Sequence, residues 1–245
     1  MDSMGKGNGD MITTERLHTL PGLVQRYMQF SGVIGQPWID TIFLKQTGRF
    51  RRAPDQPWMP VTAEQTFTTD PPSFVWNARF KVAGLPMMRA RDSYRDAHGH
   101  MYGKLAGLIN IFDARGLEID QGTMLRYLGE MVWFPTAFLG SNMTWQAMDD
   151  STAQVTFTDG GRSVSARMTF ADDGRPSNFN AQRYGDFNGK FVLASWSVPV
   201  THFEPRAGLV IPVRGQVVWN LSSGDFAYYD WEIGEVEYNR PLPNL

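Results

Sequence analysis

Residues 120–140 read Asp-Gln-Gly-Thr-Met-Leu-Arg-Tyr-Leu-Gly-Glu-Met-Val-Trp-Phe-Pro-Thr-Ala-Phe-Leu-Gly, a long helical pattern in a chain that otherwise reads as successive strands. The apolar positions follow the helical period and cover about half of the circumference, more than the roughly 100° stripe of an ordinary surface helix. They are Met124, Leu125, Tyr127, Leu128, Met131, Val132, Phe134, Phe138 and Leu139. This pattern predicts a helix that is mostly buried.

Proline at position 135 interrupts the pattern. Pro135 has no amide hydrogen to donate to the carbonyl of Met131 and crowds that turn, so we expect the helix to kink or restart near Phe134. Gly140 is a suitable residue to end it.

Arg126, Glu130 and Trp133 fall together on the remaining side of the helix. The i,i+4 spacing of Arg126 and Glu130 allows an ion pair, although base before acid is the weaker order. Two interpretations are open: this stripe meets solvent at the edge of a buried helix, or it forms the wall of a cavity.

Alternating residues dominate the rest of the chain. From Phe74 to Val82 the apolar side chains fall on one face, with Asn77, Arg79 and Lys81 on the other. Runs at 152–158 and 163–170 alternate in the same way around the hairpin signal at 159–162. Further strands are expected near 41–51, 58–68, 88–96, 101–112, 143–149, 177–184, 190–202, 209–221 and 226–238, and a short helix at 20–30 with Pro21 in its first turn.

Ten or more strands at about 4.8 Å spacing make a sheet about 50 Å wide, which must curl, split or close. We therefore predict a mainly β fold: a single strongly curved antiparallel sheet, resembling a half-barrel, wrapped around one long kinked helix, with a short N-terminal helix. A two-sheet sandwich is the alternative. The absence of repeats and linker-like tracts indicates one domain over 20–240, preceded by a flexible lead-in over 1–19.

The composition excludes several classes of function. A net charge of −2 gives no basis for binding nucleic acid, and zero cysteines exclude disulfides, thiol nucleophiles and cysteine-ligated metals. No run approaches the roughly 20 apolar residues of a membrane helix, and the first residues lack the apolar core of a signal peptide. We expect a soluble chain, located in the cytoplasm or, if an N-terminal anchor has been removed, associated with the envelope.

Catalytic motifs are absent from the sequence. There is no Gly-x-Ser-x-Gly elbow and no phosphate-binding loop. His98 and His100 make at most half of a metal site and are expected in a solvated turn, so no metal and no cofactor are predicted.

Glu130 raises the question of acid–base chemistry. It would form a catalytic pair with Glu64 or Asp92 if the fold brought two of these carboxylates together. The simpler expectation is that an arginine, either Arg126 or a strand residue such as Arg79 or Arg91, neutralises Glu130, because a buried charge needs a partner.

Several phrases resemble an uncharacterised bacterial family of the domain-of-unknown-function type (DUF6544/DUF6920-like). They lie at 20–27, 46–51, 63–65, 72–79, 92–94, 125–137, 211–212 and 218–219, and the helical phrase is the most specific of them. The resemblance implies a β-rich protein without an assigned activity. Many members look tethered to the envelope by an N-terminal hydrophobic segment, which this chain does not show. The expected architecture is also similar to the half-barrel of lipoprotein carriers, an analogy that does not fix function.

The predicted function is non-enzymatic binding or carriage of a lipid or another hydrophobic small ligand in the concave face of the sheet. The predicted lining residues are Trp76, Phe80, Trp133, Phe134 and Trp219, with Arg79, Arg126 and Glu130 as polar anchors. The alternatives are a hydrolase-type enzyme that uses Glu130 with a second carboxylate, and a structural or interaction module that presents an exposed apolar patch. The sequence does not indicate an oligomeric state.

Overall fold

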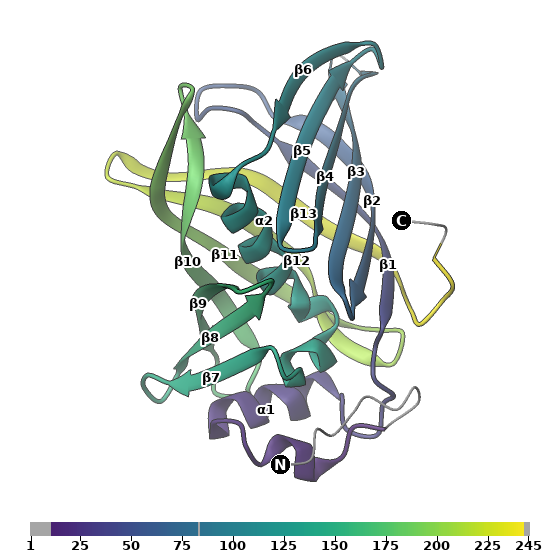
Figure 1. Ribbon diagram of the computed structural model, residues 1–245, viewed down its shortest axis with the longest axis vertical. Helices are drawn as coiled ribbons and strands as arrows, with labels where there is room; N and C mark the ends of the chain where they lie inside the picture. Colours follow the sequence, from purple (N-terminus) through teal and green to yellow (C-terminus); the bar gives the residue numbers. More distant parts are fainter. Residues whose placement is uncertain (1–10, 83, 243–245) are drawn as a thin grey trace.

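The computed structural model describes residues 11–82 and 84–242 and contains, in that range, one thirteen-stranded antiparallel sheet (Figure 1). The strands are β1 (Thr41–Phe50), β2 (Met59–Thr69), β3 (Pro72–Val82), β4 (Leu85–Arg95), β5 (His98–Leu105), β6 (Ile109–Ala114), β7 (Met143–Ala147), β8 (Thr152–Asp159), β9 (Arg162–Phe170), β10 (Pro176–Phe187), β11 (Lys190–Arg206), β12 (Leu209–Leu221) and β13 (Gly224–Tyr238).

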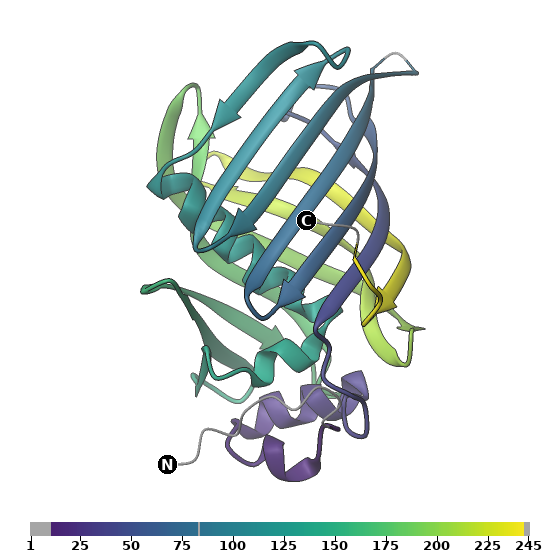
Figure 2. The same ribbon diagram turned by 45° about the vertical axis from the view of Figure 1, so that its right-hand side comes forward.

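The sheet consists of two meanders, β1–β6 and β7–β13, joined where β1 pairs antiparallel with β13. The first and last strands therefore lie in the middle of the sheet, and the short strands β6 and β7 form its two edges. The sheet curls strongly around a helix in its hollow (Figure 2). The predicted curved sheet is confirmed, and the sandwich is wrong.

One predicted strand is in fact two. The run at 101–112 divides into β5 and β6 at a turn in which Ala106 and Gly107 have φ values of 50° and 76°. Left-handed backbone is uncommon for alanine, so the sequence carried only a weak signal of this turn.

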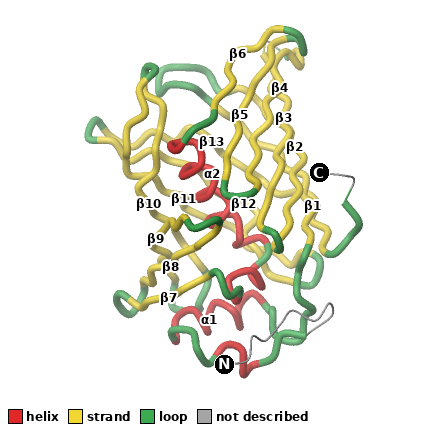
Figure 3. The backbone as a smooth tube through the Cα atoms, in the orientation of Figure 1, coloured by secondary structure: helices red, strands yellow, loops and turns green. Residues whose placement is uncertain are grey.

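The predicted helix in the hollow is α2 (Leu117–Glu130), followed by the 3₁₀ segments η2 (Met131–Trp133) and η3 (Pro135–Leu139) (Figure 3). The break falls at Phe134, whose φ and ψ of −143° and 66° are not helical, as Pro135 predicted. The helix begins three residues before position 120, directly after Gly116, whose φ is 120°. This helical segment connects β6 to β7, so it runs from one edge of the sheet to the other, and α2 contacts both β5 and β10 on its way.

A second helix, α1 (Gly22–Ser31), lies at the end of the molecule near β7, and contacts β8 and β12 (Figure 1). Pro21 precedes it, and Gly32 ends it with a φ of 74°. Before α1, the 3₁₀ turn η1 (Thr14–Leu17) places Leu17 in the core, where Ile12 is also buried. The folded chain thus extends back to residue 11, into the predicted lead-in; residues 1–10 lie outside the described residues.

Aromatic rings fill the space enclosed by the sheet between α2 and α1. The ring centroid of Phe67 lies 4.9 Å from that of Phe134, and that of Tyr127 lies 5.3 Å from that of Phe157. Pairs at these distances stabilise by about 0.5–1.5 kcal/mol beyond the area they bury. This half of the hollow is therefore a packed core.

The start of α2 is tied to the sheet through one buried carboxylate. Asp120 accepts a hydrogen bond of 2.7 Å from the amide of Gly99, lies 3.2 Å from His98 Nδ1 and forms an ion pair with Arg162. Burial alone would raise the pKa of Asp120, but these hydrogen bonds outweigh it and hold that pKa below its ordinary value.

We expect Asp120→Asn to lower the free energy of unfolding by about 2–4 kcal/mol at neutral pH, because Arg162 then loses its buried partner. A carboxylate with a lowered pKa stabilises the fold above its unfolded-state pKa, and this stabilisation is lost as the pH falls through the lowered value. Chemical denaturation across pH measures both effects, and the variant should lose less stability in acid than the natural protein. The matched control is Asp173→Asn in an exposed pair with Arg175, for which a change above about 1 kcal/mol would contradict this account.

Candidate functional site in the concave face

Period-two alternation decides which side chains enter the hollow. On β2 and β3, Ala63, Gln65, Trp76 and Ala78 are buried and point inward, while their chain neighbours point outward. The register pairs Gln65 with Trp76 and Trp76 with Asp92 on β4. Three adjacent strands thus place the Gln65 amide, the Trp76 indole and the Asp92 carboxylate side by side, facing α2.

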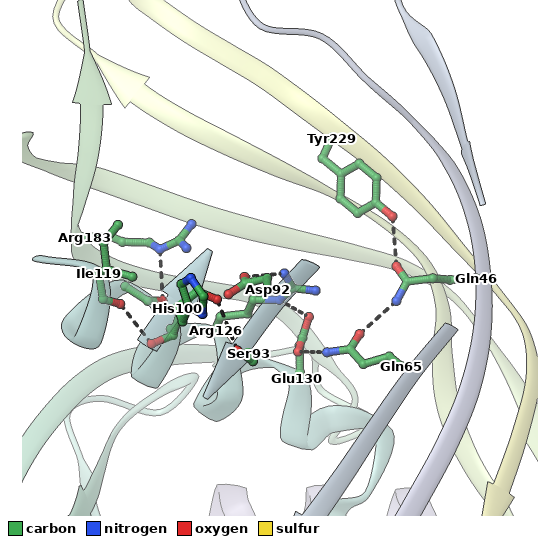
Figure 4. Close-up of polar contacts among 12 residues, drawn as sticks. Gln46, Gln65, Asp92, Ser93, His100, Ile119, Arg126, Glu130, Arg183 and Tyr229 are labelled. Carbon is green, nitrogen blue, oxygen red and sulfur yellow. Dashed lines mark hydrogen bonds and ion pairs between the residues drawn. The ribbon is translucent and has the colours of Figure 1, made fainter. Parts of the chain in front are cut away.

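Arg126 on α2 binds two carboxylates at this level. Its Nη1 donates to Asp92 Oδ2 over 2.7 Å, and its Nε donates to Glu130 Oε1 over 2.9 Å (Figure 4). The guanidinium lies 4.8 Å from the ring centroid of Trp76 and 5.1 Å from that of Phe74. Arg126 is therefore held by two charges and two aromatic faces.

Two glutamines and a tyrosine extend this cluster across the sheet. Gln65 Nε2 donates to Glu130 Oε2 over 2.7 Å, and Gln46 Nε2 donates to Gln65 Oε1 over 2.9 Å. Tyr229 on β13 donates its hydroxyl to Gln46 Oε1 over 2.9 Å. We call the six residues Gln46, Gln65, Asp92, Arg126, Glu130 and Tyr229 the polar network.

Burial sets the protonation behaviour of the polar network. It raises the pKa of Glu130 and of Asp92, and the nearby Arg126 opposes both increases. Burial likewise raises the pKa of the Tyr229 phenol. The network is enclosed by protein, yet the side chains of Arg126 and Glu130 retain 16% and 14% of their accessible surface. A small part of these two side chains is therefore accessible to solvent.

Several buried polar atoms nearby have no hydrogen-bond partner. They are Asp92 Oδ1 and the indole Nε1 atoms of Trp76 and Trp133. Since buried polar atoms normally have a partner, such atoms suit a site that meets water or the polar part of a ligand. A second inward arginine, Arg183 on β10, donates to the carbonyl of Gly122 and to the Tyr228 hydroxyl.

Small residues line the wall between the polar network and β6. The register pairs Ala63 with Ala78, Ala78 with Ala90, and Ala90 with Gly103. A Cβ on Gly103 would lie 2.3 Å from the Phe112 ring, so this glycine lets that ring rest on the sheet. The side chains on this part of β3 and β4 therefore take up less space than those nearer α1, where the same strands carry Phe74 and Tyr94.

Exposed apolar side chains gather at the end of the molecule opposite α1, around the tops of β4–β6 and the β10–β11 hairpin (Figure 1). All large exposed apolar residues of the described chain belong to this group except Met11, Ile34 and Met148. The members are Leu85, Met87, Leu108, Ile109, Ile111, Phe112, Leu117, Tyr184, Phe191, Val192 and Leu193, which we call the apolar rim. Soluble monomers rarely expose so many apolar side chains together without a binding role.

The predicted ligand-binding residues divide into three groups. Trp76, Phe80 and Trp219 are buried on the concave wall, and Trp133 packs against the ring of Trp231 at 5.3 Å. Arg126 and Glu130 belong to the polar network. Phe134 is fully buried in the aromatic core against Phe67.

Two predicted residues lie on the wrong face. Arg79 and Glu64 are exposed on the outside of the sheet, because each alternates with inward residues, Phe80 in the first case and Gln65 in the second. Glu64 therefore cannot act with Glu130. The remaining pair, Asp92 and Glu130, is bound to one arginine, an arrangement of neutralised charges that gives the hydrolase alternative no support.

The two histidines also differ from expectation. His98 and His100 lie in β5 rather than in a turn, and the turn before them is formed by Asp96 and Ala97 with φ values of 53° and 60°. His100 Nε2 lies 2.8 Å from Asp113 Oδ1. Within residues 11–82 and 84–242, no three histidine, aspartate or glutamate side chains are grouped to hold a metal ion.

The sequence prediction missed Gln46, Gln65, Arg183 and Tyr229. Gln65 had a readable signal, since it is a polar residue at an inward position between Ala63 and Phe67. Arg183 lies similarly between Ala181 and Gly185. A polar residue at an inward position of a strand needs a buried partner, and this requirement would have pointed to both.

The curved sheet with a helix across its hollow defines a LolA-like fold. The structure of a LolA superfamily protein from Nitrosomonas europaea superposes with a TM-score of 0.50 at 12% identity, covering 95% of this chain and 96% of that chain. This likeness concerns the fold alone. A porin-like protein from Bacteroides uniformis is also similar, with a TM-score of 0.30 and 9% identity over 82% of this chain and 97% of that chain, and we conclude nothing from it.

The chain belongs to DUF6544, a family of unknown function, which matches residues 10–231. The resemblance seen in the sequence is thus confirmed. No curated protein matches the chain. In the described part of the chain, no helix has the length and apolar character needed to cross a membrane.

We expect Arg126→Met to lower the free energy of unfolding by about 3–5 kcal/mol at neutral pH, because Asp92 and Glu130 lose their shared cation. Both acids then have a pKa above the unfolded value, so their contribution is present at low pH and is lost as the pH rises through the raised pKa. Denaturation from pH 5 to pH 8 should show a loss that grows with pH. Adding Asp92→Asn and Glu130→Gln should recover much of it.

Arg214→Met is the matched control, since Arg214 pairs with Glu232 on the exposed outer face and should contribute less than about 1 kcal/mol. An Arg126→Met protein as stable as the natural one at neutral pH would show that Asp92 and Glu130 do not need Arg126 as their cation.

Proposed function

We propose that the protein binds and carries a lipid or another apolar small molecule in the concave face of its sheet. The observation that carries this proposal is the apolar rim at the end of the molecule opposite α1. Burying apolar surface contributes roughly 25 cal/mol per Å², so an alkyl chain passing this rim would gain affinity from each methylene.

The polar network sets the depth to which such a ligand enters. It lies between the aromatic core near α1 and the small-residue wall at Ala78 and Ala90. An apolar chain pushed past Arg126 would strip water and partners from three charged groups, at a cost far above the gain from a few methylenes. The hollow between the network and the rim is the part that suits an apolar ligand.

Access to this hollow requires side chains to move. Phe80 and Trp219 are less than a tenth exposed, and α2 is fixed at its start by Asp120. A ligand would therefore enter by displacing these rings or by loosening α2 from β5. Displacement of α2 would also expose its buried apolar side chains, such as Leu125 and Leu128, so movement of the rings is the less costly route.

Organic-solvent extraction of purified protein followed by mass spectrometry tests the proposal, together with titration of a fluorescent fatty acid. Ala90→Phe should weaken probe binding by about tenfold or more, because the added ring fills the space in front of the small-residue wall. Ala147→Phe adds the same ring at an exposed position on β7 and should bind the probe as the natural protein does.

Three outcomes would count against carriage: a folded protein that binds no probe and yields no lipid, equal binding by Ala90→Phe, or equal weakening by both variants. A stable dimer in light scattering that hides the apolar rim would instead favour an interaction module.

A further inference from the structure

Four cations lie together on the outer face of the sheet, away from the hollow. They are Arg79 on β3, Arg89 and Arg91 on β4, and Lys104 on β5, and they line one side of a shallow depression of about 680 Å³. The register places Arg79 opposite Arg89 and Arg89 opposite Lys104. Like charges directly opposite each other on neighbouring strands destabilise a sheet. This cluster therefore carries a cost that the fold itself does not explain.

Carboxylates on the same face do not neutralise these cations. Glu64 and Glu235 line the other side of the depression, where each lies opposite Lys45, and Lys45 Nζ is 2.9 Å from Glu235 Oε2. None of the four clustered cations forms an ion pair with any residue in 11–82 or 84–242. The side near β4 thus has an excess of positive charge.

The start of β4 carries exposed apolar side chains next to these cations. Arg89 and Arg91 share the outer face, and the register shifts just before them, where Phe80 pairs with Met88 but Lys81 pairs with Pro86, which leaves Met87 as an extra residue. Leu85 is 63% exposed and Met87 is 37% exposed. In the neighbouring β5–β6 turn, Leu108 is 86% exposed. The tip of β4 and the neighbouring turn therefore carry exposed apolar side chains, and the outward cations Arg89 and Arg91 follow them along the strand.

This order matches the layers of a bilayer leaflet. Same-face residues on a strand are spaced by about 6.6 Å, and the headgroup layer of each leaflet is roughly 5–8 Å thick. With the apolar tip at the edge of the hydrocarbon, Arg89 lies nearer to it than Arg91, which is two residues further along the same face. Cations in this layer attract anionic lipids, while the exposed apolar residues at the tip enter the acyl boundary.

We propose that the outer face of β3–β5 docks on the surface of a bilayer that contains anionic phospholipids. The exposed apolar side chains beside the cations favour a membrane over a small soluble anion, which would gain nothing from Leu85, Met87 or Leu108. This docking shares Leu85, Met87 and Leu108 with the apolar rim, but the four cations on which it depends lie outside both the rim and the polar network.

Vesicle co-sedimentation tests the proposal, with phosphatidylcholine vesicles that contain or lack phosphatidylglycerol. We expect binding only to the anionic vesicles, weakened by raised salt because exposed charges are screened. Arg89→Glu should weaken it by about 30-fold, since each charge near the surface contributes about 1 kcal/mol and this change reverses one. Arg167→Glu, an exposed arginine on β9, alters the net charge equally and should leave binding unchanged.

A second pair of variants tests the apolar tip. Met87→Asp should weaken binding to anionic vesicles at least about fivefold, whereas Met148→Asp, at an exposed methionine near the end of β7, should not. Equal binding to both kinds of vesicle, or equal loss with Arg89→Glu and Arg167→Glu, would overturn the proposal. So would a stabilisation by inorganic pyrophosphate that requires Arg89 without any vesicle binding, because it would identify a small-anion site.

Discussion

The structure depends on the curl of one large sheet around the segment that connects its edges. Twist prevents thirteen antiparallel strands from lying flat, and the two strands left at the edges, β6 and β7, are joined by α2 and the 3₁₀ turns after it. The helix must therefore cross the concave side. Its position explains why it is apolar over most of its surface, since the sheet surrounds it on several sides. Its charged side chains meet polar groups of the sheet at two places, Asp120 at its start and Arg126 with Glu130 near its end.

The polar network divides the hollow into two regions with different properties. Toward α1, the rings of Phe67, Tyr127, Phe134 and Phe157 pack closely. Toward the apolar rim, the wall carries small side chains at Ala78 and Ala90 beside ring pairs such as Phe50 with Phe80. Buried charges like those of the polar network are costly to remove from water, and replacing them with apolar residues is often neutral or stabilising. Their presence at the boundary is therefore better explained by a requirement of the hollow than by stability alone.

The sequence predicted most of the fold because the alternation is clean and the turns contain glycine or aspartate. It merged β5 with β6 because the turn between them starts on an alanine with positive φ. The site was harder to predict. The same alternation that predicted β3 places Arg79 on the outer face, so the pattern itself argues against Arg79 as a polar anchor in the concave face. The contact of Gln65 with Glu130 joins residues 65 positions apart, and no local pattern contains that pairing.

The pairing of β1 with β13 also affects how the chain must assemble. During synthesis the strand at residues 41–50 emerges early, but its second neighbour comes from residues 224–238 at the far end of the chain. Until then β1 and β12 each present an unpaired backbone edge, which is the feature most prone to associate with other chains. The continuous sheet therefore exists only after residues 224–238 have left the ribosome.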